Sequence, residues 1–165
     1  MDWPTATGVL RVDPRGRGGP MKGWLIVRCD EDWFGLYEHW MQRQAGGLWV
    51  RDRNGKLQWR NYGLQRPALG PHISVVRNDR NCGGRRWRKL DGRHVRFQFD
   101  PDLADNADHI TDGRHYFWLW VRCPELEETR ASFGLTPHPP PSKHRKRHGV
   151  GAAPAPFYMT LGTRV

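Results

Sequence analysis

The apolar residues of this 165-residue chain occur in short runs separated by glycine and proline. The chain contains 19 Gly and 13 Pro, and its longest apolar run, from Tyr116 to Val121, ends at Arg122. A membrane-spanning helix needs about 20 apolar residues, so we expect a soluble protein without a membrane partner. Short runs bounded by turn-forming residues are typical of β-strands. The pattern therefore predicts several short strands within one domain.

Two kinds of periodicity predict the elements of that domain. Apolar residues spaced by three or four positions predict a helix over 33–41, and Pro124 followed by acidic residues predicts a second helix over 124–134. Asn54-Gly55 supplies the positive φ values of a tight hairpin turn. The order of elements predicts an α+β domain with one curved antiparallel or mixed sheet and two main helices. The predicted strands are 24–29, 48–50, 57–59, 71–77, 95–99, 116–123 and 157–162.

Two segments have a composition that does not favour packing. Residues 1–22 are rich in Gly, Pro and Arg, which predicts a flexible N-terminal arm in front of a domain over 23–165. Residues 136–156 contain four prolines followed by the basic run 143–148. We expect this second segment to be a mobile basic insert that acts as an electrostatic tether for polyanions.

The cysteines and the N-terminus predict where the protein works. The three cysteines, Cys29, Cys82 and Cys123, form no close pair, and their odd number argues against a disulfide framework. No basic segment leads into an apolar one at the N-terminus, so no signal peptide is predicted. We therefore expect reduced thiols and a cytoplasmic location. The histidines show no zinc-binding spacing, and no phosphate-binding loop is present, so neither a metal site nor ATP-driven chemistry is predicted.

Two triplets carry the candidate chemistry. His72-Ile73-Ser74 and Tyr158-Met159-Thr160 each lie on a predicted strand, 86 positions apart. Residues i and i+2 of a strand project from the same face, so each triplet presents a ring and a hydroxyl together. A histidine can move a proton while a hydroxyl binds a phosphate oxygen. We predict that His72, Ser74, Tyr158 and Thr160 are halves of one catalytic site; the alternative is that they are ordinary strand residues.

With these triplets, the sequence resembles the 2H phosphoesterase superfamily, whose members carry two H-x-[ST] motifs on central strands of a bilobal sheet. The resemblance extends over most of residues 23–162, and the phage-type members, often called Swiss-army-knife RNA-repair-like proteins, look most similar. It implies a single bilobal domain and a mechanism without metal or other cofactor. One histidine acts as general base, the other protonates the leaving oxygen, and both hydroxyls stabilise charge on phosphorus. The sequence departs from this pattern at Tyr158, which stands where the family has histidine.

The resemblance implies a phosphodiesterase with His72 as its sole base and Tyr158 as acid. Its expected substrate is a cyclic or 2′-linked phosphodiester of RNA or a nucleotide, as for a phage protein that repairs RNA ends or degrades cyclic nucleotide defence signals in the host cytoplasm. Three alternatives stay open: a weakened enzyme, a noncatalytic RNA- or nucleotide-binding protein on the same fold, and a basic accessory protein without a pocket.

The distribution of charge agrees with such a partner. The chain has 27 basic and 17 acidic residues, a net charge of +10, and half of that charge lies between Arg77 and Arg93. This stretch directly follows the His72 triplet. A basic loop there would bind phosphates, with Trp87 stacking on a base, whereas the alternative is a solvated surface loop. The candidate phosphate or nucleic-acid contacts are Arg77, Arg85, Arg86, Trp87, Arg88 and Lys89.

Overall fold

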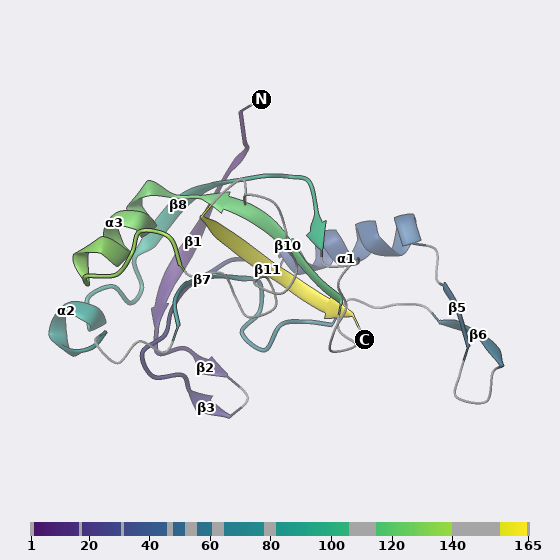
Figure 1. The fold of residues 1–165 in the computed structure, drawn as a ribbon, viewed down its shortest axis with the longest axis horizontal. Coiled ribbons are helices and arrows are strands. Elements are labelled where there is room, and N and C mark those ends of the chain that lie inside the picture. Colours follow the sequence, from purple (N-terminus) through teal and green to yellow (C-terminus); the bar gives the residue numbers. More distant parts are fainter. Residues whose placement is uncertain are drawn as a thin grey trace.

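Six antiparallel strands close into a barrel (Figure 1). The computed structural model describes residues 2–16, 18–30, 32–45, 48–51, 56–60, 65–77, 82–105, 115–139 and 156–164. Around the barrel the order is β1-β4-β7-β11-β10-β8, and β8 pairs with β1 to close it. The short strand β9 (Ala104–Asp105) adds to β10. The barrel strands are β1 (Thr5–Val12), β4 (Leu25–Arg28), β7 (His72–Val76), β8 (His94–Phe99), β10 (His115–Arg122) and β11 (Phe157–Arg164).

The closed barrel corrects two predictions. The expected bilobal α+β domain with curved antiparallel or mixed sheets and two main helices is wrong, because the described part is mostly one closed antiparallel sheet with three short helices. The expected flexible arm over residues 1–22 is also wrong, because it contains β1, a strand of eight residues. β1 pairs with β4 on one side and with β8 on the other. It is therefore the strand that joins the two ends of the sheet.

Gly8 lets β1 approach β4 closely. A Cβ atom at this position would lie 2.9 Å from the carbonyl oxygen of Arg28 and would also meet the side chain of Val27. Contacts this short do not occur at real Cβ atoms, so only glycine fits here. Glycine disfavours strands, so Gly8 makes the sequence of this segment look unlike a strand. The pairing of β1 with β4 nevertheless requires glycine at this position.

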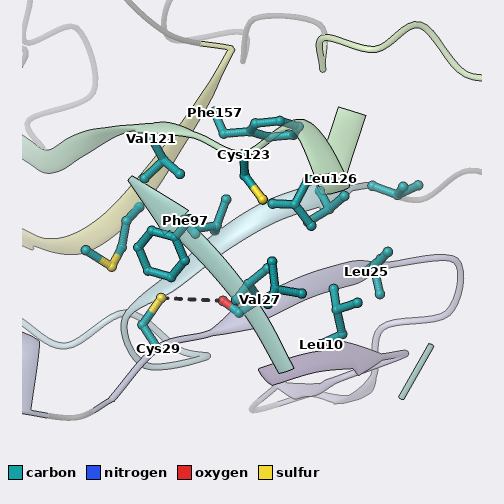
Figure 2. Packing of buried hydrophobic residues seen from close by; sticks show 14 of the residues in the cluster. Leu10, Leu25, Val27, Cys29, Phe97, Val121, Cys123, Leu126 and Phe157 are labelled. Atoms are coloured by element: carbon teal, nitrogen blue, oxygen red, sulfur yellow. Dashed lines mark hydrogen bonds between the residues drawn. The ribbon is translucent and has the colours of Figure 1, made fainter. Parts of the chain in front are cut away.

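Alternate residues of all six strands point into the barrel and form its core (Figure 2). Leu10 of β1, Val27 of β4, Phe97 of β8, Val121 of β10 and Phe157 of β11 all belong to this core. The three cysteines are buried and form no disulfide. Burial raises the pKa of the Cys29 thiol to about 12, so Cys29 is a packing residue and not a nucleophile.

Both predicted helices are present, and each contributes to the core. Trp33 of α1 (Asp32–Ala45) packs edge-on against Phe99, with 4.7 Å between ring centroids. Leu126 of α3 (Pro124–Ser132) is completely buried. The sequence did not predict the third helix, α2 (Gly84–Arg88).

Two small hairpins lie outside the barrel. The predicted hairpin is confirmed as β5 (Leu48–Arg51) paired with β6 (Leu57–Arg60), although residues 52–55, with its Asn-Gly turn, lie outside the described residues. A second hairpin pairs β2 (Arg15–Gly16) with β3 (Gly19–Pro20). Among the described residues, no helix is long and apolar enough to cross a membrane.

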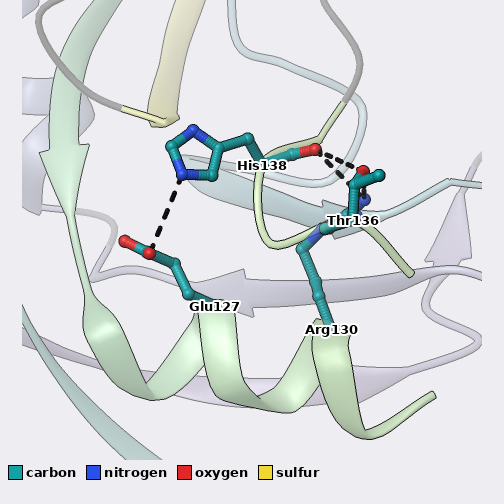
Figure 3. Close-up of polar contacts among 4 residues, drawn as sticks. All are labelled: Glu127, Arg130, Thr136 and His138. Atoms are coloured by element: carbon teal, nitrogen blue, oxygen red, sulfur yellow. Dashed lines mark hydrogen bonds and ion pairs between the residues drawn. The ribbon is translucent and has the colours of Figure 1, made fainter. Parts of the chain in front are cut away.

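Arg130 connects α3 to the segment that follows the helix (Figure 3) and to β7. Its guanidinium is buried, and Nε donates a hydrogen bond to the Thr136 carbonyl at 2.7 Å. Nη1 donates to the carbonyl of Val75 in β7. Nε2 of His138 lies 3.9 Å from Oε2 of Glu127, a residue of α3. Residues 136–139 of the predicted insert are thus fixed against α3, while 140–155 lie outside the described residues.

The barrel consists of two similar halves. The first contains β1, β4, α1 and β7, and the second repeats this order with β8, β10, α3 and β11. The sequence carries the same repeat, because Trp24–Cys29 and Trp118–Cys123 agree at five of six positions. The last strand of each half carries one of the two triplets.

Candidate functional site

The two triplets lie side by side on neighbouring strands. In the antiparallel pairing of β7 with β11, Ile73 is opposite Met159 and His72 is opposite Thr160. Extending this register by one residue places Ser74 opposite Tyr158. Ile73 and Met159 point into the core, so the alternation of a strand puts the other four residues on the outer face. The four predicted catalytic residues therefore share one patch on the outer side of the barrel wall, where His72 and Ser74 are buried and Tyr158 and Thr160 are partly exposed.

His72 has the environment of a neutral imidazole. Its ring is only 8% exposed, and Nδ1 lies 2.8 Å from the carbonyl oxygen of Gly70. With Nδ1 protonated as the donor of this bond, Nε2 keeps its lone pair. Burial lowers the pKa of His72 below its usual 6.5; the bond to Gly70 opposes this effect, and the charge of Arg77 adds to it. His72 is consequently a proton acceptor near neutral pH.

Ser74 has an unused hydroxyl. Its side chain is 5% exposed, and Oγ has no hydrogen-bond partner among the described residues. An unsatisfied buried hydroxyl costs about 1–3 kcal/mol. Thr160, on the neighbouring strand, is partly exposed. The patch thus holds one buried hydroxyl, that of Ser74, and one hydroxyl on a partly exposed residue, Thr160.

Arg77 places a positive charge beside the triplets. It follows β7 directly and is exposed. Its guanidinium donates a hydrogen bond to the Tyr158 hydroxyl and lies 5.5 Å over the same ring. The guanidinium also lies 6.0 Å from the ring centroid of Trp24. Among the residues predicted to bind phosphate, Arg77 is therefore the one that lies beside the triplets.

Sequence reasoning missed the residues on either side of the patch. Trp118 is the strand neighbour of Thr160, and its ring lies 6.4 Å from that of Tyr158. On the opposite side, Arg28 is the strand neighbour of His72. Trp118 and Arg28 both belong to the repeated segment Trp-Leu-x-Val-Arg-Cys, so recognising that repeat would have drawn attention to them.

The remaining basic candidates lie on α2 or, in the case of Lys89, directly after it; Figure 1 shows α2 beside α3. Trp87 is 1% exposed and packs edge-on against Phe133, with 5.2 Å between ring centroids. The prediction that Trp87 stacks on a base is therefore corrected, because its ring has no accessible face. The side chains of Arg85, Arg86, Arg88 and Lys89 are exposed.

Comparison of the chain with protein-family models, with curated proteins and with solved structures finds no match. Within the part of the chain that the structure describes, no three histidine, cysteine or acidic side chains are grouped to hold a metal ion. The predicted tether, residues 143–148, lies outside the described residues. The chemistry is therefore inferred from the patch on β7 and β11 itself.

Proposed function

We propose that the protein is a metal-independent phosphodiesterase that cleaves a cyclic or 2′-linked phosphodiester of RNA or a nucleotide. One observation carries this proposal: the strand pairing of β7 with β11 puts His72 next to Thr160 and brings Ser74 opposite Tyr158, with Arg77 beside them. A base, an acid, two hydroxyls and a cation then face one another across two strands. This is the set of groups that phosphodiester cleavage without a metal requires.

His72 is the general base of the proposed reaction. Its Nε2 accepts the proton of the attacking water or ribose hydroxyl as that oxygen bonds to phosphorus. The Tyr158 hydroxyl donates its proton to the leaving oxygen as the bond from phosphorus to that oxygen breaks. After one turnover His72 carries the extra proton and Tyr158 lacks one, and exchange with solvent restores both groups.

Arg77 and the two hydroxyls stabilise the charge that develops on the phosphate. The guanidinium of Arg77 provides donors for the non-bridging oxygens and offsets the negative charge left on Tyr158. Ser74 Oγ has no competing partner among the described residues. It therefore donates to a phosphate oxygen without first breaking another bond.

The alternative function is noncatalytic binding of RNA or a nucleotide on the same patch. Tyr158 in place of a second histidine favours this alternative, since a phenol is a weaker proton donor than an imidazolium at neutral pH. Both functions require a phosphate beside His72 and Arg77. Only the first requires turnover.

The test is hydrolysis of a panel of 2′,3′-cyclic phosphates, 2′-5′ linked oligoadenylates and cyclic nucleotides in EDTA. We expect turnover that survives EDTA, is lost in His72→Ala and persists in His39→Ala, which changes an exposed histidine on α1. Turnover that EDTA abolishes, or that His72→Ala leaves intact, would overturn the proposal. Binding without turnover that becomes turnover in Tyr158→His would establish the alternative.

A further inference from the structure

A groove of mixed polar and apolar lining lies on the outer face of the barrel, over β1, β4 and β8. Its volume is about 400 Å³, which is within the range of small-molecule sites. The groove is lined by residues 7–9 and Arg11 of β1, by Arg28 of β4 and the two residues that follow it, Cys29 and Asp30, and by His94 of β8. None of these residues was among the site candidates from the sequence.

The lining of the groove suits the sugar-phosphate part of a nucleic acid. Arg11 and Arg28 supply two guanidinium groups, of which that of Arg11 lies 3.8 Å from a carboxylate oxygen of Asp91. Thr7 and His94 supply further polar groups. The carboxylate of Asp30 accepts the backbone N–H of Asp32 at the start of α1, which partly satisfies its charge. Among the residues that the structure describes, His94 is the one aromatic ring in the lining of the groove. A groove of this kind binds phosphates and sugars without distinguishing bases.

Arg28 joins this groove to the His72 patch. On β4 it is paired with Val9 on one side and with His72 on the other. Directly opposite residues of antiparallel strands have Cβ atoms about 5 Å apart. Adjacent strands are about 4.8 Å apart, so β1 lies two strand spacings, about 10 Å, from β7. A chain bound at His72 therefore reaches the groove across a single strand.

We propose that the groove is a second subsite that binds the neighbouring sugar-phosphate of a single-stranded oligonucleotide whose scissile phosphate lies at His72. This inference rests on the proposed function and deepens it by naming an oligonucleotide as the substrate. The aromatic side of the patch, with Trp118, lies beyond β11 in the opposite direction. The bound oligonucleotide then runs over the barrel from His72 on β7, across Arg28 on β4, to Arg11 on β1.

The test measures binding, so that it does not depend on turnover. A fluorescently labelled single-stranded RNA octanucleotide and a labelled mononucleotide are titrated by anisotropy against the wild type, Arg11→Gln and the double variant Arg11→Gln/Arg28→Gln. We expect the octanucleotide to bind at least tenfold more tightly than the mononucleotide. The salt dependence of octanucleotide binding should weaken by about 0.7 in log–log slope for each arginine removed.

Arg15→Gln is the matched control, because it removes the same charge from the exposed hairpin β2–β3. Equal affinity for the octanucleotide and the mononucleotide, or an equal loss in Arg15→Gln and Arg11→Gln, would overturn the subsite. If Arg28→Gln impairs folding, the charge reversal Arg11→Glu replaces the double variant. Failure of the phosphodiesterase proposal would appear separately, as absent turnover with this binding pattern intact.

Discussion

The guanidinium of Arg77 holds the hydroxyl of Tyr158, a residue 81 positions later in the chain, and covers the face of the same ring. The contact crosses from the end of β7 to β11, so it connects the strand that carries the proposed base to the strand that carries the proposed acid. A cation at this point orients the phenol and, in the proposed function, attracts a phosphate.

Arg77 and Tyr158 should therefore act as a pair in catalysis. We expect Arg77→Gln and Tyr158→Phe each to lower kcat by about 100-fold, the loss typical for removal of one charge-stabilising donor. The double variant should lose less than the product of the two single effects, because the residues share one interaction. A double-mutant cycle on kcat measures this coupling. Strictly multiplicative losses would show that the contact has no role in the reaction.

The buried His72 should make stability depend on pH. The unfolded imidazole takes up a proton near pH 6.5, whereas the folded one stays neutral to lower pH, because burial lowers its pKa. The unfolded state then binds more protons, so the free energy of unfolding falls as the pH falls below about 6.5. Urea unfolding between pH 7.5 and 5 should show a shallower fall for His72→Gln than for the wild type. The control His39→Gln should follow the wild type; matching slopes for His72→Gln and the wild type would contradict the prediction.

Gly8 and Gly35 should respond to the same substitution with opposite signs. Gly8→Ala forces a Cβ atom against the Arg28 carbonyl in the barrel wall, and we expect the free energy of unfolding to fall by about 1–3 kcal/mol. Gly35→Ala places its Cβ in open space on α1 and should raise it by about 0.5–1 kcal/mol. Urea unfolding of both variants decides the matter. A neutral Gly8→Ala would mean that β1 does not need its close approach to β4.

Removal of the buried Arg130 should loosen the attachment of α3 to β7. Arg130→Met leaves the carbonyls of Val75 and Thr136 without this donor, and we expect a loss of about 3 kcal/mol in unfolding free energy. Arg88→Met, an exposed change on α2, should stay within about 0.5 kcal/mol of the wild type. Thermal or urea unfolding compares the two variants directly. Similar losses in both would argue that the buried contacts contribute little.

The sequence predicted local elements better than their assembly. The predicted strands 71–77, 95–99, 116–123 and 157–162 correspond to β7, β8, β10 and β11, and both predicted helices are present. Alternation within each strand also predicted which side chains share a face. Closure was not predictable in the same way, because strand pairing depends on partners far along the chain. β1 was missed since Gly8 and the nearby Gly-Pro-Arg composition resemble a loop.

The same contrast between predictable local structure and unpredictable assembly applies to the candidate site. The triplet spacing predicted that His72 and Ser74 act together, and likewise Tyr158 and Thr160. The register that sets His72 against Thr160 came only from the pairing of β7 with β11. The burial of Trp87 was not predicted for a similar reason. A tryptophan among arginines is expected to be exposed, but in the structure α2 places the Trp87 side chain in the core. Arg28 was missed although the repeated Trp-Leu-x-Val-Arg-Cys segment contains it.

The patch lies on the seam where the first half of the barrel meets the second. Neither half alone contains it, since β7 belongs to one half and β11 to the other. Contacts between segments this distant in sequence form slowly, because a long loop must close before they are made. A fragment of the chain that ends before β11 therefore lacks the patch, because the patch is assembled only after β11 has been synthesised. If the two halves are produced separately and associate when mixed, the appearance of the proposed activity would show that the barrel is complete.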